Sequence, residues 1–175
     1  RCVQGCPENH VKEKHEPRQC YATWQKDRKE RKYSASGGIA FGFYKRWIQN
    51  AGIVYGAAFN EKGILTQQKA ETLEEARKFR GSKYVQSYNG FSYSEIGKEL
   101  KKGKKVLFIG TPCQIAGLKA YLGKASDALV TIDLICHGTP PMSYLEEYIK
   151  EIAGAEKVDR VSFRGEKDYL SLIHI

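Results

Sequence analysis

The sequence predicts an α/β fold, in which an N-terminal α+β subdomain precedes an incomplete, mostly parallel α/β sheet domain. The first half shows one amphipathic helix, two strands separated by a glycine turn and two further helices. The second half alternates strand and helix patterns, which implies right-handed crossovers and parallel pairing. The chain has 175 residues, 41% of them hydrophobic, enough for one ordinary core or two small ones.

A polar segment comes first. Residues 1–33 show no clear hydrophobic periodicity and contain three of the five cysteines. The next segment is expected to be a helix, capped by Ser34 or Ser36 and stopped near Gly52. Its apolar side chains recur at helical spacing: Ile39, Phe43, Trp47 and Ile48.

A hairpin and two helices are expected next. The apolar run 52–59 reads as a buried strand, and Gly63 lets the chain turn into a second strand over 64–70. Thr72 and Glu75 have the spacing of a capping box for a short charged helix. Another amphipathic helix is expected to start at Ser92 or Ser94 and to end at Gly103.

The second half contains the parallel unit. Strands are expected over 106–109, 129–135 and 158–163, and helices over 114–122 and 142–153. The chain is expected to divide into a short first segment at 1–17, an N-terminal domain at 18–103 and an incomplete C-terminal domain at 104–175. The last six residues, 170–175, resemble translated adapter sequence, so they are expected to be artefactual.

Charge and composition limit the classes of function. The net charge is +9, from 29 Lys and Arg against 20 Asp and Glu. An excess of basic residues suits solubility, an anionic cofactor or nucleic acid. The charges are interspersed with Glu and no nucleic-acid motif is visible, so a basic nucleic-acid-binding module is an alternative and not the leading hypothesis. The apolar run 51–59 is too short to span a membrane, and no signal peptide is recognised, so a cytoplasmic location is expected.

Two loops that each follow a strand carry a cysteine. In an open parallel sheet, ligands bind beyond the carboxyl ends of the strands. Cys113 lies after Gly110 and Pro112, where a helix N-terminus favours a phosphate or a thiolate, and Cys136 follows the next strand. The two thiols are therefore candidate ligands of one soft-metal centre. The alternative is that either thiol fills space in the core.

Another interpretation of Cys113 needs no metal: it could be a nucleophile with His137 as its base.

Further residues suggest cofactor binding. Cys2 and Cys6 have the C-x3-C-P spacing that ends a bacterial ferredoxin run, without the preceding cysteines. The segment 34–38 could cradle a diphosphate, although an ordinary helix cap explains it nearly as well. The segment 80–84 offers two cations and an aromatic ring, which suit an anionic planar cofactor or a solvated helix end.

Four segments together resemble the coenzyme F420 hydrogenase/dehydrogenase beta subunit family, in its bacterial ferredoxin-fused branch. They are SASGG at 34–38, RGSKYVQ at 80–86, GTPCQIAGL at 110–118 and DLICHG at 133–138. The resemblance covers about residues 18–165 and implies an oxidoreductase: an iron–sulfur flavoprotein that transfers electrons between FAD, 4Fe–4S clusters and a soluble carrier of the F420 or ferredoxin type. Other oxidoreductase subunits are expected as further partners.

The resemblance also implies site residues. Cys113 and Cys136 match expected cluster ligands, and Cys2 and Cys6 match the end of the ferredoxin module. The family's upstream cysteine pair has no counterpart near 52–59, so a four-cysteine site is not evident. Catalytic residues are not assigned. Cofactor contacts are expected from these residues: Ser36, Gly37, Gly38, Lys83, Gly110, Thr111 and His137.

Overall fold

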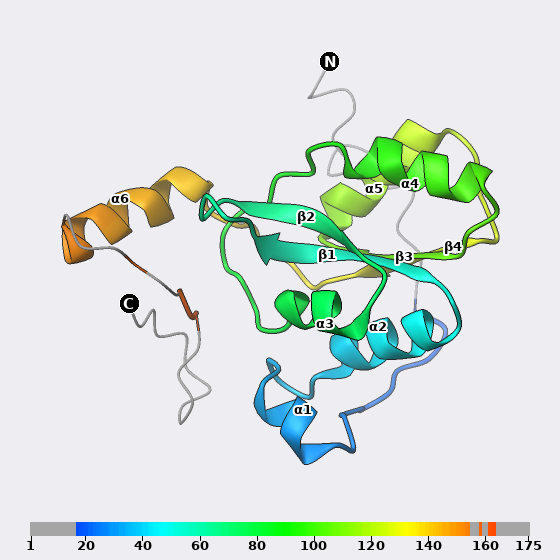
Figure 1. The fold of residues 1–175 in the computed structure, drawn as a ribbon, viewed down its shortest axis with the longest axis horizontal. Helices are drawn as coiled ribbons and strands as arrows, with labels where there is room; N and C mark the ends of the chain where they lie inside the picture. The colour runs from blue at the N-terminus through cyan, green and yellow to red at the C-terminus, as the bar shows by residue number, and fades with distance from the viewer. Residues whose placement is uncertain (1–16, 155–157, 159–160, 164–175) are drawn as a thin grey trace.

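A four-stranded sheet forms the centre of the computed structural model, which describes residues 17–154, 158 and 161–163 (Figure 1). The strands lie in the order β2-β1-β3-β4. β1 pairs in parallel with β3, and β3 with β4, whereas β2 is antiparallel to β1. The predicted mostly parallel α/β sheet is confirmed. The strands are β1 (Ile53–Phe59), β2 (Leu65–Ala70), β3 (Val106–Gly110) and β4 (Leu129–Asp133).

Helices cover both faces of the sheet (Figure 1). One face carries α2 and α3 with the 3₁₀ turn η3, and the other carries α4 and α5. The short α1 lies outside α2, and α6 lies beyond the strand ends. The helices are α1 (Arg28–Lys32), α2 (Ile39–Gln49), α3 (Leu73–Ala76), η3 (Arg77–Phe79), α4 (Ser92–Lys101), α5 (Pro112–Leu122) and α6 (Met142–Ala153).

The core has one apolar layer on each side of the sheet. Successive residues of β1 point to opposite faces, so Val54 packs with Phe41 and Tyr44 of α2, whereas Tyr55 packs with Ile96 and Ile115 of α4 and α5. All five residues of β3 are buried. Such a continuous apolar strand is typical of a parallel strand with helices on both faces.

Strands from both predicted domains share this sheet. β1 comes from residues 18–103 and β3 from residues 104–175, yet Ile53 pairs with Val106 and Tyr55 with Phe108. None of the described helices combines the length and the apolar character needed to cross a bilayer.

The strand predicted over 158–163 is wrong for the described residues of that segment. Ser162 forms only an isolated bridge, and the described positions around it join no sheet. Phe163 is buried instead in a third apolar cluster with Leu65 and Met142. Its ring stacks on Phe59 with centroids 6.4 Å apart, so an aromatic contact and not a strand ladder holds this segment.

The start of α2 also differs from the prediction. Gly38, in the left-handed region at φ 71°, occupies the N-cap position, and Ser34 donates its hydroxyl to the Glu30 carbonyl at 2.8 Å. Ser34 thus follows α1, a helix that the polar segment 1–33 did not predict. Asp27 caps α1 by accepting from the amides of Lys29 and Glu30, at 2.9 and 3.2 Å.

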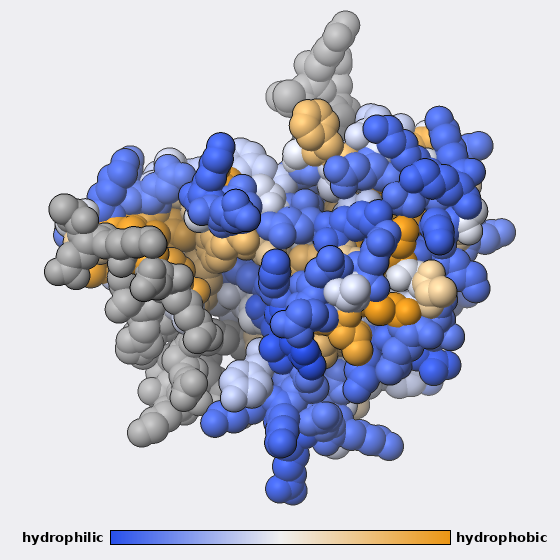
Figure 2. Space-filling view, in the orientation of Figure 1, coloured by the Kyte–Doolittle hydropathy of each residue, from blue (hydrophilic) through white to orange (hydrophobic). Residues whose placement is uncertain are grey.

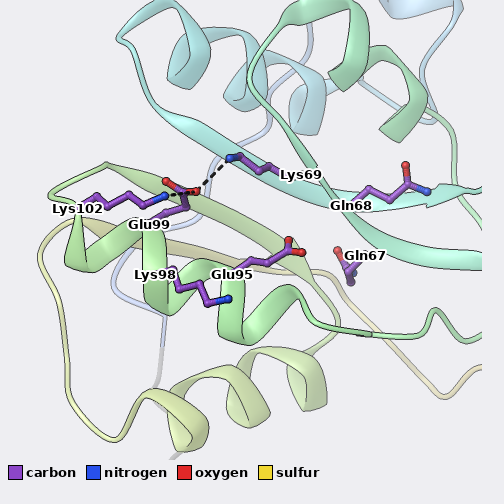
Figure 3. A pocket seen from close by; sticks show the side chains of 7 residues that line it. All are labelled: Gln67, Gln68, Lys69, Glu95, Lys98, Glu99 and Lys102. Carbon is purple, nitrogen blue, oxygen red and sulfur yellow. Dashed lines mark hydrogen bonds and ion pairs between the residues drawn. The ribbon is translucent and has the colours of Figure 1, made fainter.

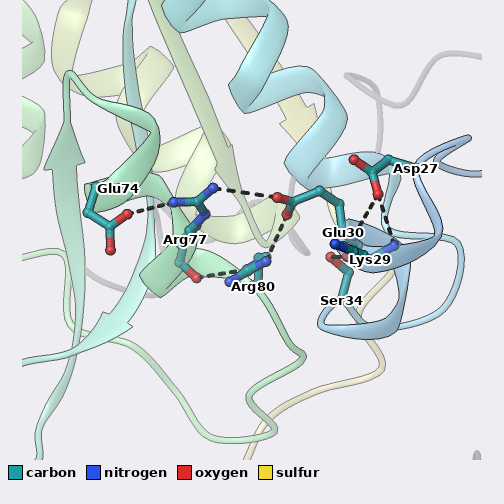
Figure 4. A network of polar contacts seen from close by, with 7 residues as sticks. All are labelled: Asp27, Lys29, Glu30, Ser34, Glu74, Arg77 and Arg80. Carbon is teal, nitrogen blue, oxygen red and sulfur yellow. Dashed lines mark hydrogen bonds and ion pairs between the residues drawn. The ribbon is translucent and has the colours of Figure 1, made fainter.

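A network of polar contacts connects α1 to η3 and to Arg80 (Figure 4). The Arg80 guanidinium donates to the Glu30 carboxylate at 2.8 Å, and Arg77 approaches the same carboxylate at 3.6 Å. The Arg80 guanidinium also lies over the rings of Tyr33 and Phe41, 5.6 and 5.2 Å from their centroids. These contacts tie α1 to α2 and to the segment after η3.

Candidate functional site

The parallel strands β1, β3 and β4 end at the same edge of the sheet, which we call the carboxyl edge. Three loops meet there: 81–90, 110–114 and 134–141. The Leu134 amide donates to the Gly110 carbonyl at 2.9 Å, and the Gln86 amide donates to the Pro140 carbonyl at 2.9 Å. The carboxyl edge is therefore built from three chain segments that bond directly to one another.

Both candidate metal ligands lie at the carboxyl edge with exposed side chains. Cys113 sits in the first turn of α5, where its sulfur lies 3.2 Å from the Thr111 hydroxyl. The Cys136 sulfur accepts from the Gly138 amide at 3.3 Å. Each sulfur therefore has a polar hydrogen-bonding group of the loop beside it. Neither thiol fills space in the core, which was the alternative explanation.

Tyr93 of α4 lies beside the loop that carries Cys113. Its hydroxyl donates to the Gln114 carbonyl at 2.7 Å and accepts from the Asn89 amide at 2.8 Å. Burial, with a smaller contribution from the charge of Cys113, raises the pKa of Tyr93 to about 12. Tyr93 therefore stays protonated at neutral pH and keeps donating to the first turn of α5.

Gln114 is the most connected polar side chain at the carboxyl edge. Its Oε1 accepts from the Thr111 amide at 3.1 Å and from Gln67 Nε2 at 3.2 Å. Its Nε2 donates to the Ser87 hydroxyl at 2.8 Å and to the Ser87 carbonyl at 3.2 Å. The motif GTPCQ contains Gln114, but a single glutamine carries no chemical signature, so its role was not predicted.

Lys83 is the cation predicted to contact a cofactor. Its Nζ donates to the Arg80 carbonyl at 2.9 Å and to the Lys78 carbonyl at 3.2 Å. Burial lowers the pKa of Lys83 to about 8. An ammonium has three donors, and contacts among the described residues use two of them.

The glycines of the 34–38 segment are explained by packing within the chain. The Gly37 carbonyl accepts from the Gln25 amide at 2.8 Å, and a Cβ on Gly37 would lie 2.8 Å from the Thr23 carbonyl oxygen. Gly38 is buried, and its positive φ suits glycine. Ser36 is exposed. The side of this segment that faces residues 23–25 is therefore filled and offers no cradle for a diphosphate.

The other predicted residues lie apart from these contacts. His137 is exposed, and within the described residues no hydrogen bond joins it to Cys113, whose hydrogen-bonding partner is Thr111. Cys20 is an exposed free thiol. Cys2 and Cys6 lie outside the described residues.

A hollow lies between β2 and α4 (Figure 3). It is an open groove of about 500 Å³ lined by charged and amide side chains. The Glu99 carboxylate forms ion pairs in the groove, at 3.1 Å with Lys69 and at 3.4 Å with Lys102. These two cations lower the pKa of Glu99. Apart from Gln67, which also bonds to Gln114, the groove and the carboxyl edge share no residue. The lining residues are Gln67, Gln68, Lys69, Glu95, Lys98, Glu99 and Lys102.

The carboxyl edge suits an anionic diphosphate better than it suits a 4Fe–4S cluster. An anionic diphosphate suits the N-terminus of α5 and Lys83. A 4Fe–4S cluster requires four thiolates, and the edge supplies two, Cys113 and Cys136. Within the described ranges, no group of three or more Cys, His, Asp and Glu side chains is placed to hold a metal ion. The described residues thus fit half of a cluster's ligand set.

Comparison with known proteins agrees with the motifs. Residues 103–173 match the family formed by the C terminus of the coenzyme F420 hydrogenase/dehydrogenase beta subunit. A chain from the xenon-derivatised F420-reducing NiFe hydrogenase complex of Methanosarcina barkeri has a similar fold, with a TM-score of 0.58 and 21% sequence identity. The match covers 78% of this chain and 51% of that one, so this chain spans about half the length of its structural relative. No curated protein matches the sequence. The family that matches residues 103–173 is the one that the four sequence motifs resemble.

Proposed function

We propose that this chain is part of an iron–sulfur flavoprotein oxidoreductase that transfers electrons between FAD, a 4Fe–4S cluster and a soluble carrier of the F420 or ferredoxin type. One observation carries the proposal: two exposed thiols follow the ends of adjacent parallel strands, and each has a hydrogen-bond donor or hydroxyl within 3.3 Å of its sulfur. The family match supports the oxidoreductase class.

Each residue of the carboxyl edge would have a defined task. Cys113 and Cys136 would be two ligands of the cluster, and the remaining ligands would come from elsewhere, such as Cys2 and Cys6 or another subunit. The amides at the start of α5, with Gly110 and Thr111, would face the anionic part of FAD, and Lys83 would add one positive charge. A bound flavin can bridge two-electron and one-electron chemistry.

The structural relative suggests the setting. It is a chain of a hydrogenase complex, so we propose that this chain also works with other oxidoreductase subunits. His137 is exposed at the same edge and would lie near the cofactor.

Anaerobic reconstitution tests this proposal. The full chain is incubated with iron, sulfide and FAD, and bound iron and visible absorbance are measured after desalting. Cys113→Ser and Cys136→Ser are each expected to lose more than half of the bound iron, because each removes one thiolate ligand. Cys20→Ser is the matched control, since Cys20 is also an exposed free thiol, and it should retain the wild-type iron content.

Two results would contradict the proposed cluster. If the wild-type chain binds neither iron nor FAD, or if all three serine variants bind as much iron as the wild type, then the two thiols do not serve a cluster.

A further inference from the structure

We infer that Gln114 is a positioning residue, which holds the Cys113 loop and the Cys136 loop in one mutual arrangement. This inference rests on the proposed function, because the fixed arrangement matters when both thiols serve one site. Gln114 itself is 7% exposed.

The carbonyl oxygen of Gln114 fixes the Cys113 side. It accepts from the Thr111 amide at 3.1 Å, so it anchors the backbone two residues before Cys113. The same oxygen accepts from Gln67 Nε2 of β2 at 3.2 Å. The turn into α5 is thereby tied to the far strand of the sheet and not only to its own helix.

The nitrogen of Gln114 reaches toward the Cys136 side. It donates to the hydroxyl and the carbonyl of Ser87, at 2.8 and 3.2 Å. The neighbouring residue, Gln86, donates its amide to the Pro140 carbonyl at 2.9 Å, and Pro140 belongs to the loop that carries Cys136. Hydrogen bonds of the Gln114 side chain, together with the peptide link between Ser87 and Gln86, therefore connect Thr111 to Pro140.

Only a neutral amide can make all these contacts. A glutamate at position 114 could accept from Thr111 and Gln67 but could not donate to Ser87, and an apolar side chain could do neither. Buried amides cost free energy unless they are hydrogen-bonded, and both polar atoms of the Gln114 amide have partners. These partners come from three chain segments, so the contacts of Gln114 fix how the two loops lie relative to each other.

Cross-linking of the two thiols measures that geometry. A short bifunctional maleimide is applied to the full chain, and mass spectrometry quantifies the peptide that joins Cys113 to Cys136. Gln114→Met keeps the side-chain length and removes every hydrogen bond. We expect it to lower the yield about two- to tenfold, the change in population that one hydrogen bond sets.

Gln68→Met is the matched control. Gln68 is a half-buried glutamine of β2 that bonds to the Ala58 carbonyl and the Thr66 hydroxyl and not to either loop. Its variant should cross-link like the wild type. Ser87→Ala removes only the hydroxyl contact, so it should lower the yield less than Gln114→Met does, and it serves as the test if Gln114→Met does not fold.

Hydrogen exchange separates this inference from the proposed function. Gln114→Met should exchange faster at residues 111–114 and at 136–140, whether or not the protein binds a cluster. If the wild type does not cross-link but this exchange is faster, the positioning role holds and the shared site fails. Equal yields and equal exchange in the wild type and Gln114→Met, or in Ser87→Ala if that variant alone folds, would overturn the inference.

Discussion

Lys83 is an ammonium that burial has made easier to deprotonate. Its pKa is lowered from 10.5 to about 8 by loss of hydration on burial. Between these two values the unfolded chain binds more protons than the folded chain, so this group makes stability rise with pH. Below about pH 8 the side chain is charged in both states and its burial penalty is fully present.

Lys83→Met removes this dependence. The free energy of unfolding of the wild type, minus that of the variant, is expected to rise by about 1–2 kcal/mol from pH 8 to pH 10.5. Urea denaturation at several pH values measures it, and taking the difference cancels the titration of other groups. A flat or falling difference would show that Lys83 is hydrated in the folded protein.

The sequence predicts the location of the two thiols, Cys113 and Cys136, but not the contacts of Gln114. Cys113 and Cys136 could be placed at one edge because each follows a predicted strand beside Gly and Pro, and parallel strands end on the same side. Gln114 could not, because its partners Gln67 and Ser87 are 47 and 27 positions away along the chain. Which distant residues meet depends on strand order, which local patterns do not encode.

At the scale of elements, Gly56 lets the side chains of Tyr44 and Phe79 approach β1 closely. A Cβ at this position would clash with the Tyr44 hydroxyl and would lie 2.7 Å from Phe79. Gly56→Ala is therefore expected to lower the free energy of unfolding by about 1–3 kcal/mol through overpacking. Chemical denaturation measures this loss.

Gly97 of α4 is the matched control for the same substitution. A Cβ there would meet only Leu122, at an ordinary contact distance of 3.5 Å. Gly97→Ala should raise the free energy of unfolding by about 0.5–1 kcal/mol, because alanine is the better helix former. Equal effects at both positions would contradict the packing seen around β1.

The attachment of α1 depends on the pair Arg80–Glu30. Both side chains are mostly buried, at 18% and 19% exposed. Arg80→Met keeps much of the packing against Tyr33 and Phe41 and leaves Glu30 without its nearest cation, at an expected cost of about 1–3 kcal/mol. Thermal unfolding measures the loss. Glu74→Gln, which breaks only the exposed pair with Arg77, should change the midpoint much less, and the reverse order would refute this account.

Element prediction succeeded where one physical signal was sufficient. The capping box of Thr72 and Glu75 is present, with the Glu75 carboxylate accepting from the Thr72 amide at 3.1 Å. The strand predicted at 158–163 failed because an apolar run fits a strand and an aromatic cluster equally well, and Phe163 joined the cluster. α1 was missed because it has no buried residue and hence no apolar period.

At the scale of the whole molecule, the two ends of the sheet differ in chemistry. The carboxyl edge carries the two thiols and the first turn of α5, whereas the opposite edge carries the basic run KELKKGKK at 98–105. Figure 2 shows hydrophilic side chains over the α4 end of the molecule and hydrophobic ones gathered around α6. The carboxyl edge is the proposed place for an anionic cofactor, and the groove between β2 and α4, which three lysines and two glutamates line, is the competing place.

Hydrogen exchange of the full chain with and without FAD decides between these places. The proposed function predicts slower exchange on binding at 81–90, 110–114 and 134–138, because FAD would cover the amides of the carboxyl edge. Protection confined to residues 95–101 of α4 and to β2 would instead place the cofactor in the groove, and it would contradict the assignment of the carboxyl edge as the redox site.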